Sequence, residues 1–421
     1  MKNSILTYKE SVIRSIMLSV IFFLTMVVHY IYKAGIGGLL IKTFSAMKTP
    51  WFDIGDALLA IILVILIFIL RTKKVKISKS ISYISLLFNV VLISATPLWD
   101  EGNIILIIVG LIGNILIFIA TYNIWMLVIS TAFKKSWITL SIVGMGAQLG
   151  VYVGAYIGQV MVVNIKEEIP ALIGGMYIII FLLITRCIKK FSCEGTKFDG
   201  FYPEEAQKVN TIEQQLKKGF SPYIKTLLFL ILIGSVFGRS INWLVQQQAD
   251  YKNTIEEASG FLADFYQSGA ILSILCQLMI TPIALKYLKD KRGLILQPIL
   301  AILIPVFLLA KINISVNIIF LMIFTAFDYT LYNSFKEKLW LHTPLVNKIY
   351  HKAIAALIIP KIAGVLNALS ILIIAGYDYS IWIAYIIIIS LIWLFTVIYT
   401  VYLNENININ SVEAKPTINA V

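Results

Sequence analysis

Several ionisable side chains occur inside or close to long apolar stretches of this sequence. A charge at such a depth in hydrocarbon is expensive unless it faces a polar cavity or a partner of opposite sign. The residues of this kind are Lys33, Arg239, Asp264, Asp328 and Lys361. Three of them are basic, and an arginine can hold a phosphate or carboxylate through two hydrogen bonds. The set therefore predicts a cavity that binds an anion.

Each of these residues also has a purely structural interpretation. Arg239 or Lys361 can pair with Asp328 and hold neighbouring helices together. Lys33 can extend its ammonium group to the membrane interface. Asp264 can be an acidic residue in the first turn of a helix, or an ion-pair or coupling residue.

Uncharged polar residues and glycines occur in the same stretches. We include the amides Asn242 and Gln148 among the candidate substrate-binding residues, although buried amides most often hydrogen bond to neighbouring helices. Glycines follow at steps of two and four residues at Gly144, Gly146, Gly150, Gly154 and Gly158. This spacing predicts close packing against another helix, and a sliding interface for alternating access is the second interpretation.

Twelve long apolar stretches contain most of these side chains, in a sequence that is 59 % hydrophobic. A helix needs about 20 apolar residues to cross a bilayer, and a helix satisfies all its backbone polar groups in lipid. We therefore predict an all-α integral membrane protein with twelve transmembrane helices. The predicted spans are 13–38, 52–70, 81–98, 103–132, 138–163, 170–188, 222–247, 260–285, 294–310, 316–333, 353–375 and 381–402.

Basic residues gather in the loops after the even-numbered spans, which predicts that these loops are cytoplasmic. They are Arg71, Lys73, Lys74, Lys76, Lys79, Lys134, Lys135, Lys286, Lys289, Lys291, Arg292, Lys336, Lys338, Lys348 and Lys352. The opposite loops hold Asp100, Glu101, Glu167, Glu168, Glu256, Glu257 and Asp378. We expect both termini inside a bacterial inner membrane. The net charge of +13 then indicates contact with anionic lipids, not with nucleic acid.

The longest polar stretch divides the chain into two groups of six spans. We predict a first half at 1–188, a cytoplasmic linker with a short helix at 189–221, a second half at 222–402 and a disordered cytoplasmic tail at 403–421. Six spans, a central linker and six spans are the layout of the major facilitator superfamily.

Catalytic patterns are missing from the sequence. The three histidines are not at metal-ligand spacing, and neither a glycine-rich phosphate loop nor a nucleophile elbow occurs. The sequence thus disfavours an enzyme, and we expect no cofactor and no metal. Three cysteines, two of them at or beside the cytoplasmic face, predict no disulfide. We expect a monomer.

Four blocks of the sequence are similar to one family. From Leu331 the chain reads LYNSFKEKLWLHTPL and from Lys348 it reads KIYHKA, which resembles the LFDPTKEMAYIPL and KVKGKAA signature of the ATP:ADP antiporter, or nucleotide transporter, family. FGRSIN from Phe237, FLADF from Phe261 and GMGAQ from Gly144 resemble the family's YGxSxN, FMGDF and GLGAN. In this comparison Lys33 matches a lysine of span 1, Lys361 matches an arginine of span 11, and Asp328 replaces a lysine.

The resemblance implies a major-facilitator-type six plus six bundle that exchanges nucleotides by alternating access. It marks Lys336, Glu337 and Lys352 as residues of the family motif. Our hypothesis for the mechanism is that Lys33, Arg239 and Lys361 neutralise phosphate while Asn242 and Trp243 hold the base, although Arg239 has no counterpart in the family. The alternative is a proton- or ion-coupled transporter of another anionic metabolite, with Asp328 as the coupling carboxylate. A scaffold or receptor has no soluble sensor domain to support it.

Overall fold

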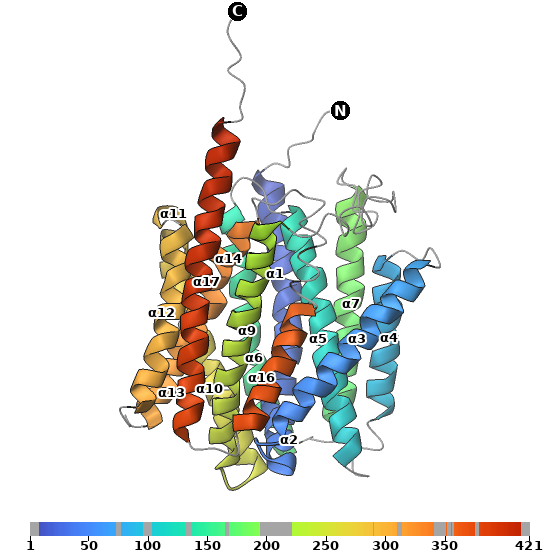
Figure 1. The fold of residues 1–421 in the computed structure, drawn as a ribbon. Helices are drawn as coiled ribbons and strands as arrows, with labels where there is room; N and C mark the ends of the chain where they lie inside the picture. The colour runs from blue at the N-terminus through green and yellow to red at the C-terminus, as the bar shows by residue number, and fades with distance from the viewer. Residues whose placement is uncertain are drawn as a thin grey trace, which may run out of the picture.

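The computed structural model consists of helices and short connections throughout the residues that it describes (Figure 1). These residues are 8–72, 77–95, 103–131, 136–164, 168–193, 221–288, 290–309, 314–340, 351, 355, 358–374 and 379–413. Within these ranges no strand occurs, which fulfils the prediction of an all-α chain.

The helices of the first half correspond one to one with the first six predicted spans. The first span is a single rod built from α1 (Tyr8–Ile31), the π-helical segment η1 (Tyr32–Ile36) and α2 (Gly37–Phe44). The next five are α3 (Thr49–Thr72), α4 (Ile77–Ser94), α5 (Asn103–Thr131), α6 (Ser136–Asn164) and α7 (Ile169–Cys193).

The helices of the second half follow the same order. They are α9 (Pro222–Asp250), α10 (Ile255–Leu275) continued by η5 (Cys276–Ile280) and α11 (Thr281–Tyr287), α12 (Asp290–Leu309), α13 (Ile314–Phe327) continued by η6 (Asp328–Tyr332) and α14 (Asn333–Leu339), α16 (Ile359–Ile374) and α17 (Tyr379–Glu413).

Local sequence explains where the helices of the second half begin. The Ser221 hydroxyl accepts a hydrogen bond from the backbone N–H of Ile224, and Pro222 occupies the first helical position, where its missing N–H costs nothing. Thr254 caps α10 by accepting from the Glu257 N–H at 3.1 Å. The Glu257 carboxylate in turn accepts from the N–H of Asn253.

Span 10 continues beyond residue 333 to Leu339, so Lys336, which we predicted in a cytoplasmic loop, lies in α14. Two predicted domain boundaries also differ from the structure. α7 continues to Cys193, so the first half extends beyond residue 188. α17 continues to Glu413, so the predicted disordered tail at 403–421 is helical as far as residue 413. The rest of that tail and most of the predicted linker, 194–220, lie outside the described residues. The π-helical segments η1, η5 and η6 are a further feature that the apolar pattern did not predict.

The surface and the helix lengths match a membrane environment. Within the described residues, seven helices are long and apolar enough to cross a bilayer. Large apolar side chains such as Leu182, Ile373 and Phe395 are about two-thirds exposed on the outside of the bundle. Water would penalise such a surface, whereas lipid does not. The chain is a multi-pass membrane protein.

The described residues form two hydrophobic cores, one in each half of the bundle. One runs from Leu18 to Cys187 and lies entirely in the first half, while the other consists mainly of residues between Tyr223 and Val401. The halves meet where α6 packs against α10 and where α3 packs against α16. Figure 1 shows α3 and α16 together at the front of the bundle, and α1 begins at the end of the bundle where α17 ends.

The glycines of α6 bring its backbone against α1 inside the first half. A Cβ on Gly154 would lie 2.8 Å from the Val27 Cα, and one on Gly158 would lie 2.9 Å from the Ile31 carbonyl oxygen. Gly146 and Gly150 meet Ser19 and Phe23 in the same way. These four glycines therefore allow α6 and α1 to pack closely. Because both helices belong to the first half, this contact is not an interface between the halves.

Candidate functional site

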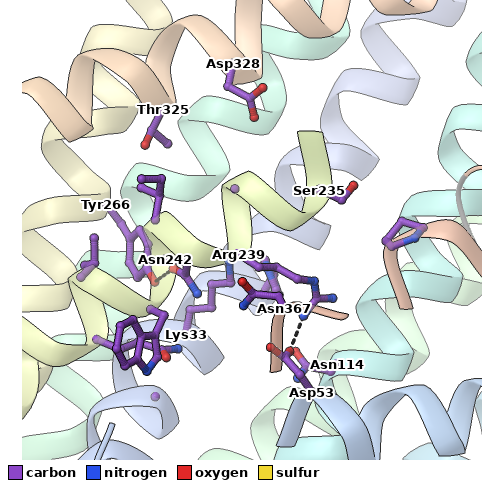
Figure 2. A pocket seen from close by; sticks show the side chains of 18 of the residues that line it. Lys33, Asp53, Asn114, Ser235, Arg239, Asn242, Tyr266, Thr325, Asp328 and Asn367 are labelled. Carbon is purple, nitrogen blue, oxygen red and sulfur yellow. Dashed lines mark hydrogen bonds and ion pairs between the residues drawn. The ribbon is translucent and has the colours of Figure 1, made fainter. Parts of the chain in front are cut away.

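A cavity of about 600 Å³ lies between the two halves. The first half contributes residues of α1, η1, α2, α3 and α5 to its walls, and the second half contributes residues of α9, α10, α13, η6, α14 and α16. Figure 2 shows part of its lining from close by and labels ten of these side chains. Among the predicted site residues, Lys33, Arg239, Asn242, Asp328 and Lys336 line this cavity.

Lys33 points into the cavity from η1, between two aromatic rings. Its Nζ lies 5.4 Å from the centre of the Tyr30 ring and 5.7 Å from that of the Tyr266 ring, so both rings attract the ammonium group. Tyr266 belongs to the other half, and its hydroxyl donates a long hydrogen bond of 3.5 Å to the Asn242 side-chain oxygen. Within the described part of the chain, Lys33 forms no ion pair.

In the described part of the chain, two ion pairs join the halves beside the cavity. The Arg239 guanidinium donates to the Asp53 carboxylate, and the Lys361 ammonium donates to the Asp56 carboxylate. Both acidic residues come from α3 in the first half, and both basic residues come from the second half. We call these four side chains the ionic junction. The structural interpretation in which Arg239 or Lys361 pairs with Asp328 is therefore wrong.

Helix periodicity explains how four charges from three helices meet. Asp53 and Asp56 are three residues apart on α3, and Lys361 and Gly364 are three residues apart on α16, so each pair lies on one helix face. The Arg239 side chain of α9 crosses α16 at Gly364, where an added Cβ would lie 3.0 Å from the Arg239 Cζ. The missing side chain of Gly364 leaves the space through which Arg239 reaches Asp53.

Asp328 lies in another part of the cavity, away from Lys33 and Asp53 (Figure 2). It opens the π-helical segment η6, and π-helical turns inside helices are frequent at functional sites. Its carboxylate forms no hydrogen bond or ion pair within the described residues, while Lys336 interacts with it electrostatically from two turns further along. The Lys336 Nζ lies 5.7 Å from the centre of the Tyr332 ring.

The charges on the cavity wall balance. Among the described residues, three basic side chains, Lys33, Arg239 and Lys336, and three acidic side chains, Asp53, Asp56 and Asp328, line it. Arg239 is already paired with Asp53, so only part of the positive charge is available to a solute. The site suits one anionic group better than a highly charged one, unless the ion pairs open.

One end of the cavity is closed by direct contacts between the halves. Residues 42–49 of the first half meet residues 243–252 of the second, and we call this contact the seal. The Trp243 indole N–H donates to the Ala46 carbonyl at 3.1 Å, and the Ala46 N–H donates to the Asp250 carboxylate at 2.8 Å. Lys42 donates to the carbonyls of Asp250 and Lys252.

Solved structures share this architecture over nearly the whole chain. A crystal structure of a variant of the E. coli fucose:proton symporter FucP matches with a TM-score of 0.58 and 12 % identity, over 93 % of this chain and 98 % of that chain. A second, described as a major facilitator superfamily transporter, FucP, in the outward conformation, matches with a TM-score of 0.59 and 14 % identity, over 93 % and 99 %. The chain has the major facilitator fold.

Sequence comparisons add nothing to this. No family model matches the chain, and no curated protein matches it. The fold agrees with the predicted six plus six bundle. The ATP:ADP antiporter resemblance stays a prediction.

The structure places the remaining predicted site residues outside the cavity wall or outside the described residues. Gln148 is buried in α6 and is not part of the cavity wall, and Asp264 is exposed on α10, also away from the cavity. Lys361 is buried behind the wall and reaches the cavity only through Asp56. Glu337 lies near the end of α14, and Lys352 lies outside the described residues.

Sequence analysis missed Asp53 and Asp56, the two acidic members of the junction. They lie near the start of an apolar stretch, and two carboxylates at that depth need partners. The same reasoning that singled out Lys33 would have found them.

Proposed function

We propose that this chain transports an anionic metabolite across the membrane through the central cavity. Lys33 carries the proposal: an ammonium group without a carboxylate partner among the described residues, held between Tyr30 and Tyr266 and facing a cavity, attracts a solute of negative charge. The aromatic rings and the Asn242 amide beside it offer a surface for an apolar or hydrogen-bonding part of the same solute.

Alternating access is the mechanism that this geometry supports. The cavity lies between two halves with separate cores, and the seal closes it at one end. Rocking of one half against the other would break the seal while both cores keep their packing. The solute site would then face each side of the membrane in turn.

A nucleotide is the first solute to test, because the blocks around Lys336 and Arg239 resemble those of nucleotide transporters. Tyr30, Tyr266 and Trp243 line the cavity and can stack on a base, and Asn242 can hydrogen bond to it. A triphosphate brings about four negative charges, so its binding requires Arg239 to exchange its acidic partner Asp53 for phosphate.

A thermal-shift titration of the purified protein tests this proposal. We expect ATP, ADP, GTP or NAD to stabilise the wild type, with nucleosides and sugar phosphates as controls. The variant Lys33→Gln should lose about tenfold or more in apparent affinity, because a hydrogen bond to a charged group contributes about 1.5–3 kcal/mol. Lys286→Gln removes the same charge from an exposed position and should bind as the wild type does.

Two results would contradict the proposal. Equal stabilisation of Lys33→Gln and the wild type by every anion would remove Lys33 from the site. Stabilisation by nucleosides alone would point to a neutral solute.

Proton- or ion-coupled uptake of another anionic metabolite is the second candidate. Asp328 favours it, because a cavity-facing carboxylate without a hydrogen-bond or ion-pair partner in the described residues can take up and release a proton as the halves move. In that case Lys33 would hold the anion and Asp328 would carry the proton.

A further inference from the structure

We propose that Asp53 competes with the transported anion for the Arg239 guanidinium, so that anion binding releases α3 from α9 and allows the seal to open. The inference rests on the proposed transport function and adds a specificity-determining residue to it. A solute that unlocks the halves in this way must present a carboxylate or phosphate group, because those groups match the two-pronged guanidinium as Asp53 does.

The two pairs of the ionic junction differ in exposure, and the difference decides which of them a solute can reach. The side chains of Arg239 and Asp53 are 24 % and 30 % exposed, and both residues line the cavity. Those of Lys361 and Asp56 are 6 % and 5 % exposed. A solute anion can therefore replace Asp53 on Arg239, whereas the Lys361–Asp56 pair is shielded from it.

The released carboxylate does not remain without compensation. Asp53 interacts electrostatically with Lys33 as well as with Arg239. When the solute takes Arg239, Asp53 stays in the field of the ammonium group. The solute adds negative charge to the cavity, and the ammonium group of Lys33 offsets part of it, which lowers the electrostatic cost of the step.

A single helix turn connects the junction to the seal. Arg239 and Trp243 are four residues apart on α9, so they lie on the same face one turn from each other. Trp243 holds the Ala46 carbonyl at the seal, and Asp53 lies in the first turns of α3, which starts at Thr49, directly after the seal residues of the first half. Loss of the Arg239–Asp53 pair therefore removes a contact between α3 and α9 directly beside both chain segments that close the cavity, which leaves the seal to its own hydrogen bonds.

A close approach of backbones adds to the seal at this end. A Cβ on Gly38 of α2 would lie 2.9 Å from the Ser259 Cα of α10. Contacts this close leave no room for a solute to pass. The seal must open as a unit, and the Arg239–Asp53 pair is the neighbouring contact between the halves that lines the cavity.

Anion affinity distinguishes competition from a structural role. In Asp53→Asn the competitor of the solute is gone, so we expect ADP and inorganic phosphate to bind about tenfold more tightly than to the wild type. A residue that only supported the fold would weaken binding when replaced. Glu256→Gln removes one exposed negative charge outside the cavity and should leave both affinities unchanged.

The distance across the seal tests the unlocking step. Spin labels at Lys48→Cys and Tyr251→Cys, both exposed positions on opposite sides of the seal, report its opening in a background without native cysteines. We expect a single short distance in the ligand-free wild type and a longer one when ADP or phosphate is added. Ligand-free Asp53→Asn should already populate the longer distance.

Gly364→Ala provides a second variant that keeps every charge. Its Cβ would push the Arg239 guanidinium away from Asp53, so the longer distance should appear without ligand in this variant too. An unchanged short distance in both variants, or weaker anion binding by folded Asp53→Asn, would overturn the inference. If neither ADP nor phosphate binds the wild type, the transport proposal for these anions fails. The distances measured without ligand still decide whether the ionic junction keeps the seal closed.

Discussion

At the scale of single residues, the charged side chains at the cavity are of two kinds, those in an ion pair with the opposite half and those without one among the described residues. Arg239 and Lys361 are held by carboxylates of the opposite half, so their first effect is to join the halves. Lys33 and Asp328 face the cavity without such a partner among the described residues. Both lie in π-helical segments, where the changed backbone geometry turns side chains away from the regular helix pattern. Our proposals assign the solute to Lys33 and the proton to Asp328.

The substitution Asp328→Asn tests the second role. We expect it to abolish accumulation of solute driven by a proton gradient and to leave exchange of solute intact, because an amide can no longer bind and release the proton. Uptake into proteoliposomes with and without an imposed pH gradient measures both activities. Unchanged accumulation by this variant would exclude Asp328 from the coupling.

At the scale of elements, the distance between α1 and α6 depends on four glycines spaced four residues apart. They remove side chains from one helix face, and the backbone of α1 occupies that space. The contact lies within the first half, so it makes that half rigid and leaves relative motion to the α6–α10 and α3–α16 contacts. The sliding interface that the glycine spacing also suggested is thus not located at these four residues.

Gly154→Ala should destabilise the protein by about 1–3 kcal/mol, since its Cβ would overlap the backbone of Val27 and force the two helices apart. Gly175→Ala on α7 is the matched control, because no atom lies within 4 Å of the added Cβ. It should stabilise by up to about 1 kcal/mol through helix propensity. The midpoint of thermal unfolding in detergent compares the two, and equal midpoints would contradict the packing argument.

At the scale of the whole molecule, an even number of spans returns the chain to the end of the bundle at which it started. α1 begins and α17 ends at the same end (Figure 1). The basic loops lie after the even-numbered spans, and basic residues near spans favour the cytoplasmic side. In that orientation the seal closes the external end of the cavity, and the solute would enter the structure described here from inside.

Reporter fusions measure this orientation directly. A reporter placed after residue 195 should be cytoplasmic and one placed near residue 167 should be external, because basic loops are retained inside during insertion. The opposite pattern would invert the molecule and place the seal on the cytoplasmic side.

Local pattern was sufficient to determine the membrane class, the twelve helical spans and their grouping into two sets of six. Hydrophobic runs and cap residues act within a few residues along the chain, and the bilayer enforces helices wherever a run is long enough. The presence of charges within spans also follows from the sequence. It selected Lys33, Arg239 and Asp328, which line the cavity, and Asp264, which lies elsewhere. The uncharged amide Gln148, which we chose for its polarity, also lies elsewhere.

Only the tertiary structure decided which charges meet. Arg239 and Asp53 are separated by 186 positions, and Lys361 and Asp56 by 305. Their pairing depends on the packing of α3 against α16 and on the space that Gly364 leaves for Arg239. The periodicity of a single helix does not predict these pairs. It shows which residues share a face of that helix, but not which other helix that face will contact. The ionic junction therefore arises from the arrangement of the two halves.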